Sequence, residues 1–288
     1  MAADRPTASA AGELTLGGDM PVHRLGFGAM RITGQGIWGE PEDRDGAIAL
    51  LRRLVDLEVN FIDTADSYGP AVSEELIAEA LHPYPPDLVI ATKGGLTRPG
   101  PGSWQPDCRP ERLKRCCDES LLRLKLDAIP LYQLHTVDAK VPLEESIGAL
   151  AELRDEGKVR HVGLSNAGVE HLRRAQEIVP IASVQNRYSV TARDSEDVLN
   201  ACEEQGLAFI PWFPLDAGRI GADVLAEIAS AHGATPAQVA LGWLLRHSDV
   251  ALPIPGTSSI EHLEENVAAA GVRLTDDELE RLDGLATN

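Results

Sequence analysis

The stretch Asn60-Phe61-Ile62-Asp63-Thr64-Ala65-Asp66-Ser67-Tyr68-Gly69 contains the pattern that decides the fold. Its apolar start is typical of a short buried strand, and polar residues follow at the point where the strand ends. An amphipathic segment with helical spacing comes next, before another apolar run. A strand, a loop and a helix in this order predict parallel strands, because each helix returns the chain to the starting edge of the sheet.

This strand-then-helix unit repeats along the chain at a spacing of about 30 residues. The runs predicted as strands are Arg24–Gly28, Asn60–Asp63, Leu88–Lys93, Ile129–His135, Val159–Ser165, Ala182–Gln185, Ala208–Pro211 and Val250–Ile254. Eight such units most naturally close into a (β/α)8 barrel of the TIM type, which is an α/β fold. A doubly wound open sheet is the alternative, but the count of eight and the helices in nearly every gap favour the barrel.

Both ends of the chain add elements to this barrel. Residues 1–12 are rich in small residues, and we expect them to be disordered. Residues 13–23 alternate around Gly17-Gly18-Asp19, which predicts a β-hairpin before the first barrel strand. The capping box Thr275-Asp276-Asp277-Glu278 predicts an extra C-terminal helix, and Thr235-Pro236-Ala237-Gln238 predicts the start of another helix. We therefore expect one barrel domain over residues 13–288.

Composition narrows the classes of partner. The chain has 288 residues and a formal net charge of −19, from 26 Lys and Arg against 45 Asp and Glu. Such a charge repels nucleic-acid phosphates and anionic membrane surfaces, so we expect neither as a partner. No apolar run reaches the ~18 residues that span a bilayer, and the first residues lack the apolar core of a secretory signal. The four cysteines suit neither a disulfide framework nor a Cys-x-x-Cys metal pair. We expect a cytoplasmic protein without a bound metal, a monomer or weak homo-oligomer, that acts on a small molecule.

Four titratable side chains fall at the ends of three consecutive predicted strands. Asp63 ends one strand and Tyr68 follows in its loop, Lys93 ends the next strand, and His135 ends the third. Taken alone, each residue has an ordinary structural explanation, such as a loop cap, a solvated charge or a packed ring. Because the active site of a barrel lies at the carboxyl ends of its strands, we expect these four residues to meet and to be catalytic.

The four residues suit the transfer of a proton to a carbonyl group. A tyrosine phenol has an ordinary pKa of ~10, and a nearby ammonium such as that of Lys93 is expected to lower the pKa of Tyr68 while Asp63 holds the ammonium in place. A neutral His135 can hydrogen-bond and orient the carbonyl. Tyr68 is then the general acid of a carbonyl reduction, and a cofactor has to supply the hydride.

The Gly-x-Gly-x-x-Gly motif Gly34-Gln35-Gly36-Ile37-Trp38-Gly39 lacks the context of a dinucleotide fingerprint. That fingerprint opens a helix directly, whereas here Glu40-Pro41-Glu42-Asp43 separates the glycines from the helix expected near Arg44. We interpret the motif as a loop at the barrel rim. Trp38 in this loop and Trp104 in another Gly-rich segment are the predicted walls of a substrate pocket, with ordinary packing as the alternative, and residues Asp216–Ile220 are expected at the same rim.

The last predicted strand runs through Ile254-Pro255-Gly256-Thr257-Ser258-Ser259 into a helix expected from Glu261 to Ala270. Small and hydroxyl-bearing residues before a helix N-terminus suit an anion, and barrels often bind phosphate after their last strands. The segment is therefore a candidate phosphate site, and Ser258 or Ser259 equally suits the N-cap of the helix.

In this order, these motifs resemble those of the aldo-keto reductase family from about Glu13 to the end of the chain. The matching segments are Asn60–Ala65 with Tyr68-Gly69, Lys93, His135, Gly163-Leu164-Ser165-Asn166, Val184-Gln185-Asn186, Trp212-Phe213-Pro214-Leu215, Ile254-Pro255-Gly256-Thr257 and Glu265-Asn266. The resemblance implies that Asp63, Tyr68, Lys93 and His135 are the catalytic tetrad. Within the family the chain is most similar to bacterial pyridoxal reductases (pyridoxine 4-dehydrogenases), through Trp38–Pro41, Ser103-Trp104, Trp212–Leu215 and Ile254–Ser259.

The resemblance also implies NADPH, or NADH, as the cofactor. The residues implied to bind it are Ser165, Asn166 and Gln185 at the carboxamide, Trp212 on the nicotinamide ring, and Phe213, Leu215, Gly256, Thr257, Ser258, His262, Glu265 and Asn266 elsewhere. Many members have an arginine where this chain has His262, and Phe213 replaces a small hydroxyl residue. Because imidazole gains a positive charge only as the pH falls, we expect a weaker preference for NADPH over NADH than an arginine gives.

The sequence thus predicts an NAD(P)H-dependent oxidoreductase that reduces an aldehyde or ketone to an alcohol, with pyridoxal as a candidate substrate. A non-catalytic, nicotinamide-binding regulatory subunit is the alternative, and it predicts a broken tetrad, whereas all four residues are present. A barrel aldolase with Lys93 as its Schiff-base nucleophile is a third class, and it requires a lysine without a carboxylate partner.

Overall fold

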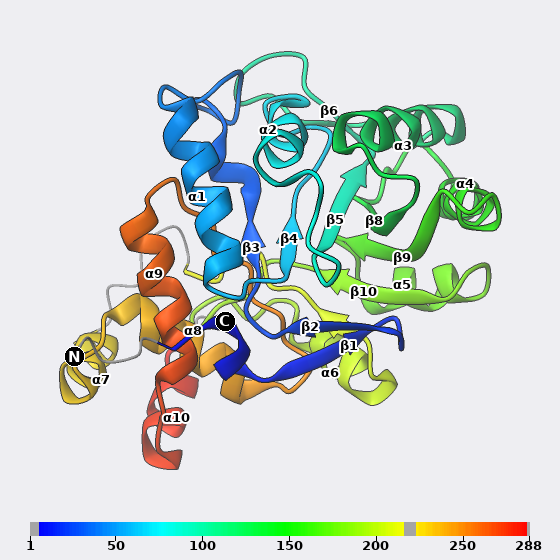
Figure 1. Cartoon of the computed structure of the whole chain (residues 1–288). Helices are drawn as coiled ribbons and strands as arrows, with labels where there is room; N and C mark the ends of the chain where they lie inside the picture. The colour runs from blue at the N-terminus through cyan, green and yellow to red at the C-terminus, as the bar shows by residue number, and fades with distance from the viewer. Residues whose placement is uncertain (1–5, 216–222, 287–288) are drawn as a thin grey trace.

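The computed structural model describes residues 6–215 and 223–286. Among these residues, seven strands form a parallel sheet that curls into a barrel with helices around it (Figure 1). In spatial order the strands are β11 (Ala208–Phe209), β10 (Ile181–Gln185), β9 (Val159–Ser165), β8 (Ile129–Leu134), β5 (Val89–Gly94), β4 (Phe61–Asp63) and β3 (Phe27–Gly28). Every neighbouring pair in this sheet is parallel, and the predicted barrel of βα units is confirmed.

The eighth predicted strand, residues 250–254, is not a regular strand, yet it closes the barrel. Phe209 N donates to Val250 O at 2.9 Å, so the segment pairs with β11. On its other side, Gly26 N donates to Pro253 O at 3.0 Å, next to β3. The pairing is irregular because Pro253 has no backbone N–H for a ladder bond.

Helices alternate with the strands along the chain and lie outside the barrel (Figure 1). They are α1 (Arg44–Asp56), α2 (Val72–Leu81), α3 (Pro110–Leu124), α4 (Leu143–Asp155), α5 (Val169–Gln176), α6 (Glu196–Gln205), α7 (Asp223–His232), α8 (Pro236–His247), α9 (Ile260–Ala268) and the extra C-terminal helix α10 (Asp276–Asp283). The predicted capping boxes at Thr235 and Thr275 begin α8 and α10. None of these helices is long and apolar enough to cross a bilayer.

Several short elements complete the described part of the chain. They are β1 (Glu13–Leu16), β2 (Met20–His23), β6 (Leu96–Thr97), β7 (Gln105–Pro106) and the 3-10 helices η1 (Ala8–Ala11), η2 (Ala29–Ile32) and η4 (Ala269–Gly271). The first two strands form the predicted hairpin, in which Gly17 and Gly18 have φ of 65° and 84°, as a tight hairpin turn requires. Leu16 and Val22 share a buried cluster with Phe61 at the start of β4, so the hairpin covers the amino ends of the strands.

The prediction that residues 1–12 are disordered is wrong for residues 8–11. These residues form η1, in which Ala8 is fully buried and its N–H donates to Leu57 O at 2.9 Å. The hydroxyls of Thr7 and Ser9 both donate to the Glu58 carboxylate at 2.6 Å. Contacts with the residues after α1 hold the segment, although its composition is that of a frayed terminus. Residues 1–5 lie outside the described residues.

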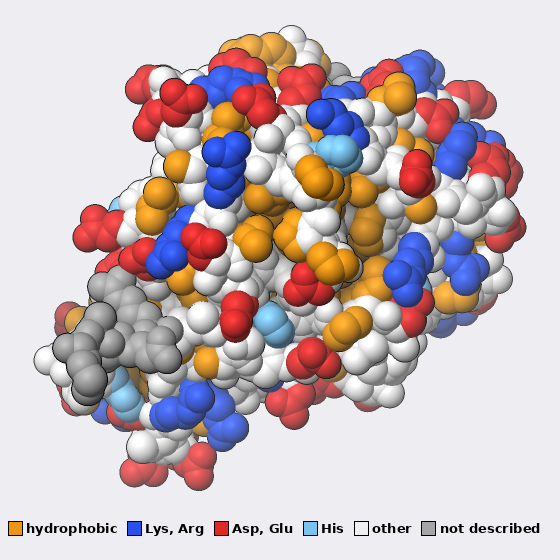
Figure 2. Space-filling model, viewed as in Figure 1, with side chains coloured by type: hydrophobic (Ala, Val, Ile, Leu, Met, Phe, Trp, Pro, Cys, Tyr) orange, Lys and Arg blue, Asp and Glu red, His pale blue; other side chains and the backbone are white. Residues whose placement is uncertain are grey.

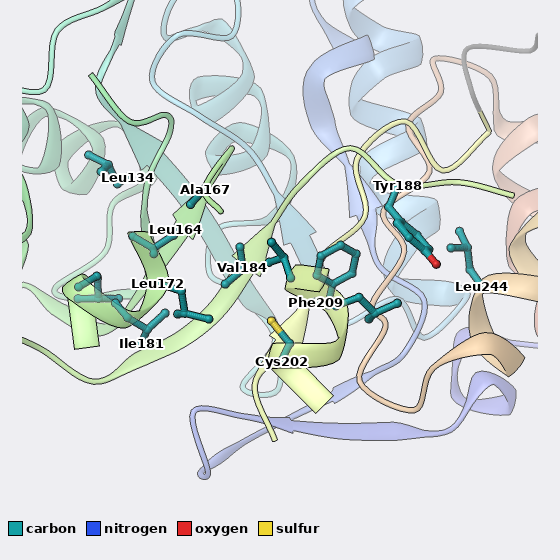
Figure 3. Packing of buried hydrophobic residues seen from close by; sticks show 14 of the residues in the cluster. Leu134, Leu164, Ala167, Leu172, Ile181, Val184, Tyr188, Cys202, Phe209 and Leu244 are labelled. Atoms are coloured by element: carbon teal, nitrogen blue, oxygen red, sulfur yellow. The ribbon is translucent and has the colours of Figure 1, made fainter. Parts of the chain in front are cut away.

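Buried hydrophobic side chains fill the space between the barrel and its helices (Figure 3). Leu164 of β9 and Val184 of β10 belong to one cluster with Leu172 of α5. In the same cluster, the rings of Tyr188 and Phe209 meet edge-on with centroids 5.5 Å apart. All four cysteines are buried and free of disulfides. Close packing of this kind fixes the positions of the strand ends, where the site lies.

Candidate active site

Strand alternation points two of the predicted catalytic residues into the barrel. Phe61 lies two residues before Asp63, Ala91 lies two residues before Lys93, and both belong to the buried cluster inside the barrel. Because residues two apart on a strand share a face, Asp63 and Lys93 face the same interior at the carboxyl ends of β4 and β5.

The neighbouring loops bring the other two residues to the same place. His135 directly follows β8, which lies beside β5, and Tyr68 lies in the loop after β4. Lys93 Nζ donates to Asp63 Oδ2 at 2.7 Å and to Tyr68 Oη at 3.4 Å. The rings of Tyr68 and His135 meet edge-on with centroids 5.8 Å apart. The four side chains are buried, and the structure brings them together in one group.

Two glutamines complete the surroundings of Asp63. Its Oδ1 accepts hydrogen bonds from Gln133 Nε2 at 3.2 Å and from Gln185 Nε2 at 2.8 Å. Gln185, which is expected at the cofactor, lines the cavity and also orients the Asp63 carboxylate through its amide. Gln133 was not predicted, although it lies two residues before His135 and so shares its inward face. The amide oxygen of Gln133 is buried without a partner.

Burial has the largest effect on the pKa values of Tyr68, Lys93 and His135. It raises the pKa of the Tyr68 phenol above its ordinary value, because desolvation outweighs the opposing effect of the Lys93 ammonium. Burial alone would lower the pKa of Lys93, but Asp63 and Tyr68 together raise it. Burial, assisted by the Lys93 charge, holds the pKa of His135 well below its usual value. The Lys93 ammonium lowers the pKa of Tyr68, as predicted, but the larger effect of burial makes the net shift upward. The phenol is therefore protonated, the amine is charged and the imidazole is neutral.

The group opens into a cavity of about 460 Å³. Its walls include Asp63, Tyr68 and His135, the predicted substrate residue Trp104, and the predicted cofactor residues Ser165, Asn166, Gln185, Trp212, Phe213, Leu215 and Gly256. Trp38 is not among the wall residues, but its neighbour Ile37 is. Residues Asp216–Ile220, which the sequence placed at the same rim, lie outside the described residues.

Five predicted cofactor residues do not reach this cavity. They are Thr257, Ser258, His262, Glu265 and Asn266, which lie just before α9 or on it. Ser259 is the N-cap of α9, and its hydroxyl accepts from His262 N at 3.4 Å. His262 is exposed in the first turn of the helix, while Thr257 and Asn266 are buried. The structure therefore divides the predicted cofactor residues into a group at the cavity and a group at α9.

The cavity also has walls that the sequence analysis did not identify. Met30 and Arg31 come from η2, Leu96 comes from β6, and Ile37 comes from the glycine-rich motif. That motif is a rim loop, as predicted: Asp43 caps α1, and the glycines precede it. None of these residues has a chemically distinctive pattern, so only the meeting of the loops reveals them.

Three wall residues other than glycine have left-handed backbone. Ile37, Asn166 and Phe213 have φ of 58°, 55° and 53°. Such a conformation costs on the order of 1–3 kcal/mol for a side chain that does not favour it, most of all for a β-branched one. Strain of this kind concentrates where a backbone has to present particular groups to a ligand.

Asp66, in the same loop as Tyr68, is a buried carboxyl that the tetrad does not include. Its Oδ1 has no hydrogen-bond partner, and its nearest cation is Arg112, at 4.0 Å from Oδ2. Burial raises its pKa to about 7, against a hydrogen bond with the Cys116 thiol that lowers it. Among the described residues, no group of three or more His, Cys, Asp or Glu is arranged to hold a metal ion.

Comparisons with known proteins agree with this geometry. The model of the aldo/keto reductase family matches residues 24–287. An uncharacterized oxidoreductase of Schizosaccharomyces pombe is 48% identical over 96% of this chain and 90% of that protein. Pyridoxine 4-dehydrogenase of Escherichia coli is 42% identical over 93% of this chain and 96% of that protein. An aldo-keto reductase of Klebsiella pneumoniae in complex with NADPH superposes with a TM-score of 0.81 at 29% identity, over 95% of this chain and 94% of that one.

Proposed function

Because the chain belongs to the aldo/keto reductase family, we propose that it reduces the carbonyl group of an aldehyde or ketone to an alcohol with NADPH. One observation carries the proposal: a buried Lys93 contacts both Asp63 and Tyr68, and the phenol and carboxylate face a cavity with His135. This arrangement places a protonated phenol and a neutral imidazole where a carbonyl oxygen can be received.

The polar groups of the cavity fit a nicotinamide. Ser165 and Asn166 line it beside the indole of Trp212, whose Nε1 is buried without a hydrogen-bond partner. Hydroxyl and amide groups match a carboxamide, and an indole face suits a flat ring. When bound, the cofactor supplies the hydride that the side chains lack.

The side chains of this chain manage the proton and the orientation of the substrate. Tyr68 Oη donates its proton to the carbonyl oxygen, and the adjacent Lys93 ammonium stabilises the phenolate that remains. Asp63 fixes the ammonium through the 2.7 Å contact. His135 Nδ1 lies 3.4 Å from Ser67 Oγ, and the other nitrogen of the neutral ring is the group that we propose hydrogen-bonds the carbonyl oxygen.

The two other classes have less support. An aldolase needs a neutral amine, whereas Asp63 and Tyr68 raise the pKa of Lys93 and keep it charged. A regulatory subunit does not need all four catalytic side chains, whereas here these side chains contact one another in the cavity wall.

For the substrate, we propose a planar aromatic aldehyde such as pyridoxal. Support comes from the similarity to pyridoxine 4-dehydrogenase and from the aromatic and apolar walls of the cavity at Ile37, Trp104 and Phe213. Flat aromatic surfaces favour flat aromatic ligands.

The test follows the nicotinamide absorbance band while the protein is incubated with NADPH and pyridoxal or another aromatic aldehyde. We expect absorbance to fall only when protein, cofactor and aldehyde are all present. Titration with NADPH should also quench tryptophan fluorescence, and Trp212→Ala should weaken that binding. Quenching without turnover of any aldehyde would favour the regulatory subunit.

A further inference from the structure

Arg98 joins three loops at the rim of the cavity. It follows β6 and is half-buried. Its Nε donates to Ser103 O at 3.0 Å, its Nη1 to Ile37 O at 2.9 Å and to Ser67 O at 3.0 Å, and its Nη2 to Gly36 O at 3.0 Å. A planar guanidinium has five N–H groups in a fixed fork, so four of them are engaged by backbone carbonyls.

The same guanidinium supports two tryptophan rings. Its Cζ lies 3.6 Å from the centroid of Trp104 and 5.6 Å from that of Trp38. Trp104 in turn meets Tyr68 and His135 edge-on, with centroids 6.3 and 6.4 Å away. Arg98 therefore holds the aromatic wall that faces the proposed proton donor.

Arg98 also binds the strained part of the glycine-rich loop. Ile37 is a β-branched residue in the left-handed region, and it lines the cavity. Such a conformation persists only where surrounding contacts determine it. The carbonyls of Gly36 and Ile37 both accept from Arg98, while Ile37 N donates to Gly34 O at 3.0 Å.

We propose that Arg98 is a positioning residue that holds Ile37 and Trp104 as a rigid wall, and that this wall gives the enzyme its preference for planar aromatic aldehydes. The inference rests on the proposed carbonyl reduction. Since four of its five N–H groups bind backbone, Arg98 acts through the wall rather than as a direct anchor for the substrate. A ring aldehyde gains contact area from a preformed flat wall, whereas a three-carbon aldehyde gains little.

Tyr68 has anchors that do not involve the side chain of Arg98. Its N–H donates to Ala65 O at 3.2 Å, its carbonyl accepts from Ser73 N at 3.2 Å, and its phenol contacts Lys93. Loss of Arg98 should therefore affect binding of the aromatic ring more than the chemical step. An effect on KM for the aromatic aldehyde without an effect on kcat indicates a role in the cavity wall, whereas general support of the fold would affect both constants.

The experiment compares Arg98→Lys with the parent enzyme, using NADPH with pyridine-4-carboxaldehyde or propanal. Lysine keeps the charge but loses the fork and the planar stack. We expect KM for the aromatic aldehyde to rise roughly five- to tenfold, the scale of one aromatic contact. We expect kcat to change less than about twofold and the constants for propanal to stay the same, because the tetrad is intact. Hydrogen exchange of the peptide that covers residues 34–39 should become faster.

Arg193→Lys is the matched control. Arg193 stacks on Trp243 with its Cζ 4.2 Å from the ring centroid, and neither residue lines the cavity. This variant should leave both aldehydes unaffected. The inference about Arg98 would be overturned if Arg98→Lys left KM for the aromatic aldehyde unchanged. It would also be overturned if the variant lowered kcat/KM equally for both aldehydes. A parent enzyme that reduces neither aldehyde would overturn the proposed function itself, and hydrogen exchange would then still report whether Arg98 orders the loop.

Discussion

At the scale of single residues, burial decides what the tetrad can do. Tyr68 and Lys93 are nearly or fully excluded from solvent, with 7% and 0% of their surface exposed. Desolvation keeps the phenol protonated, and the Asp63 carboxylate keeps the amine charged. A phenol that is protonated over the working pH range suits reduction, in which it gives a proton away.

The first prediction concerns a variant that lacks the phenol proton of Tyr68. Tyr68→Phe should lower kcat at least about 100-fold, the usual scale of general acid catalysis, and leave the Kd of NADPH within about twofold. Steady-state kinetics and fluorescence titration measure the two effects. Tyr84→Phe is the control, because Tyr84 Oη donates to Leu124 O at 2.6 Å away from the cavity. Equal kcat in Tyr68→Phe and the parent would disprove the role of the phenol.

Asp66 gives a prediction about stability and pH. Its pKa is about 7 in the folded protein and ordinarily 3.8, so between these values the unfolded chain releases a proton that the folded chain keeps. Asp66 therefore costs no stability below about pH 4, and it destabilises the fold increasingly up to about pH 7, by at most about 4 kcal/mol. Asp66→Asn should raise Tm relative to the parent at pH 8 and less so at pH 5.

Calorimetry at both pH values tests this expectation. Asp127→Asn changes an exposed carboxylate and should give the same small difference from the parent at both values. A Tm difference for Asp66→Asn that does not depend on pH would mean that Asp66 is ionised at the same pH in the folded and unfolded chains.

At the scale of elements, the first turn of α9 is where the choice of cofactor is predicted to be made. Ser259 caps this helix, and His262 stands exposed at its third position. Backbone N–H groups and the helix dipole favour an anion there, and a protonated imidazole adds a charge. An exposed charge at a helix end contributes a modest free energy, so the effect on affinity is several-fold rather than large.

The prediction at this scale concerns the 2′-phosphate that distinguishes NADPH from NADH. His262→Arg should strengthen NADPH binding roughly two- to fivefold and leave NADH binding nearly unchanged, because a permanent charge in the first turn of α9 attracts the 2′-phosphate. His171→Arg, at the equivalent position of α5, is the control. If His262→Ala leaves the ratio of the two Kd values unaltered, His262 does not contact the phosphate.

At the scale of the whole molecule, the net charge of −19 acts on an anionic cofactor from a distance. Figure 2 shows acidic and basic side chains interspersed on the visible face. A negative mean field opposes the approach of NADPH, and dissolved salt screens it over about 10 Å at 0.1 M. Binding then depends on local groups such as those of α9.

Association kinetics test this field. Raising the ionic strength from about 0.02 to 0.2 M should accelerate the association of NADPH, and should do so less for NADH, which carries fewer negative charges. Stopped-flow measurement of tryptophan quenching gives both rates. A slower association of NADPH in salt would show instead that positive groups near the cavity, such as Arg31, outweigh the net charge.

The sequence by itself determined the features that depend on neighbours along the chain. The pattern of apolar residues in the strands and helices predicted the barrel. The capping boxes at Thr235 and Thr275 predicted where two helices begin. Because all parallel strands end at one rim, the positions of Asp63, Lys93 and His135 at strand ends were enough to predict their meeting.

Only the tertiary structure decided what depends on contacts between distant segments. Packing against the residues after α1 orders residues 8–11, and closure of the ring draws residues 250–254 into an irregular pairing. The sequence predicted a low pKa for Tyr68 from the charge of Lys93, but the depth of burial reverses the direction. Arg98 has no local signature, since its partners come from three loops that the barrel brings together. Local pattern fixes which element forms, whereas desolvation and long-range hydrogen bonds exist only after the chain has closed on itself.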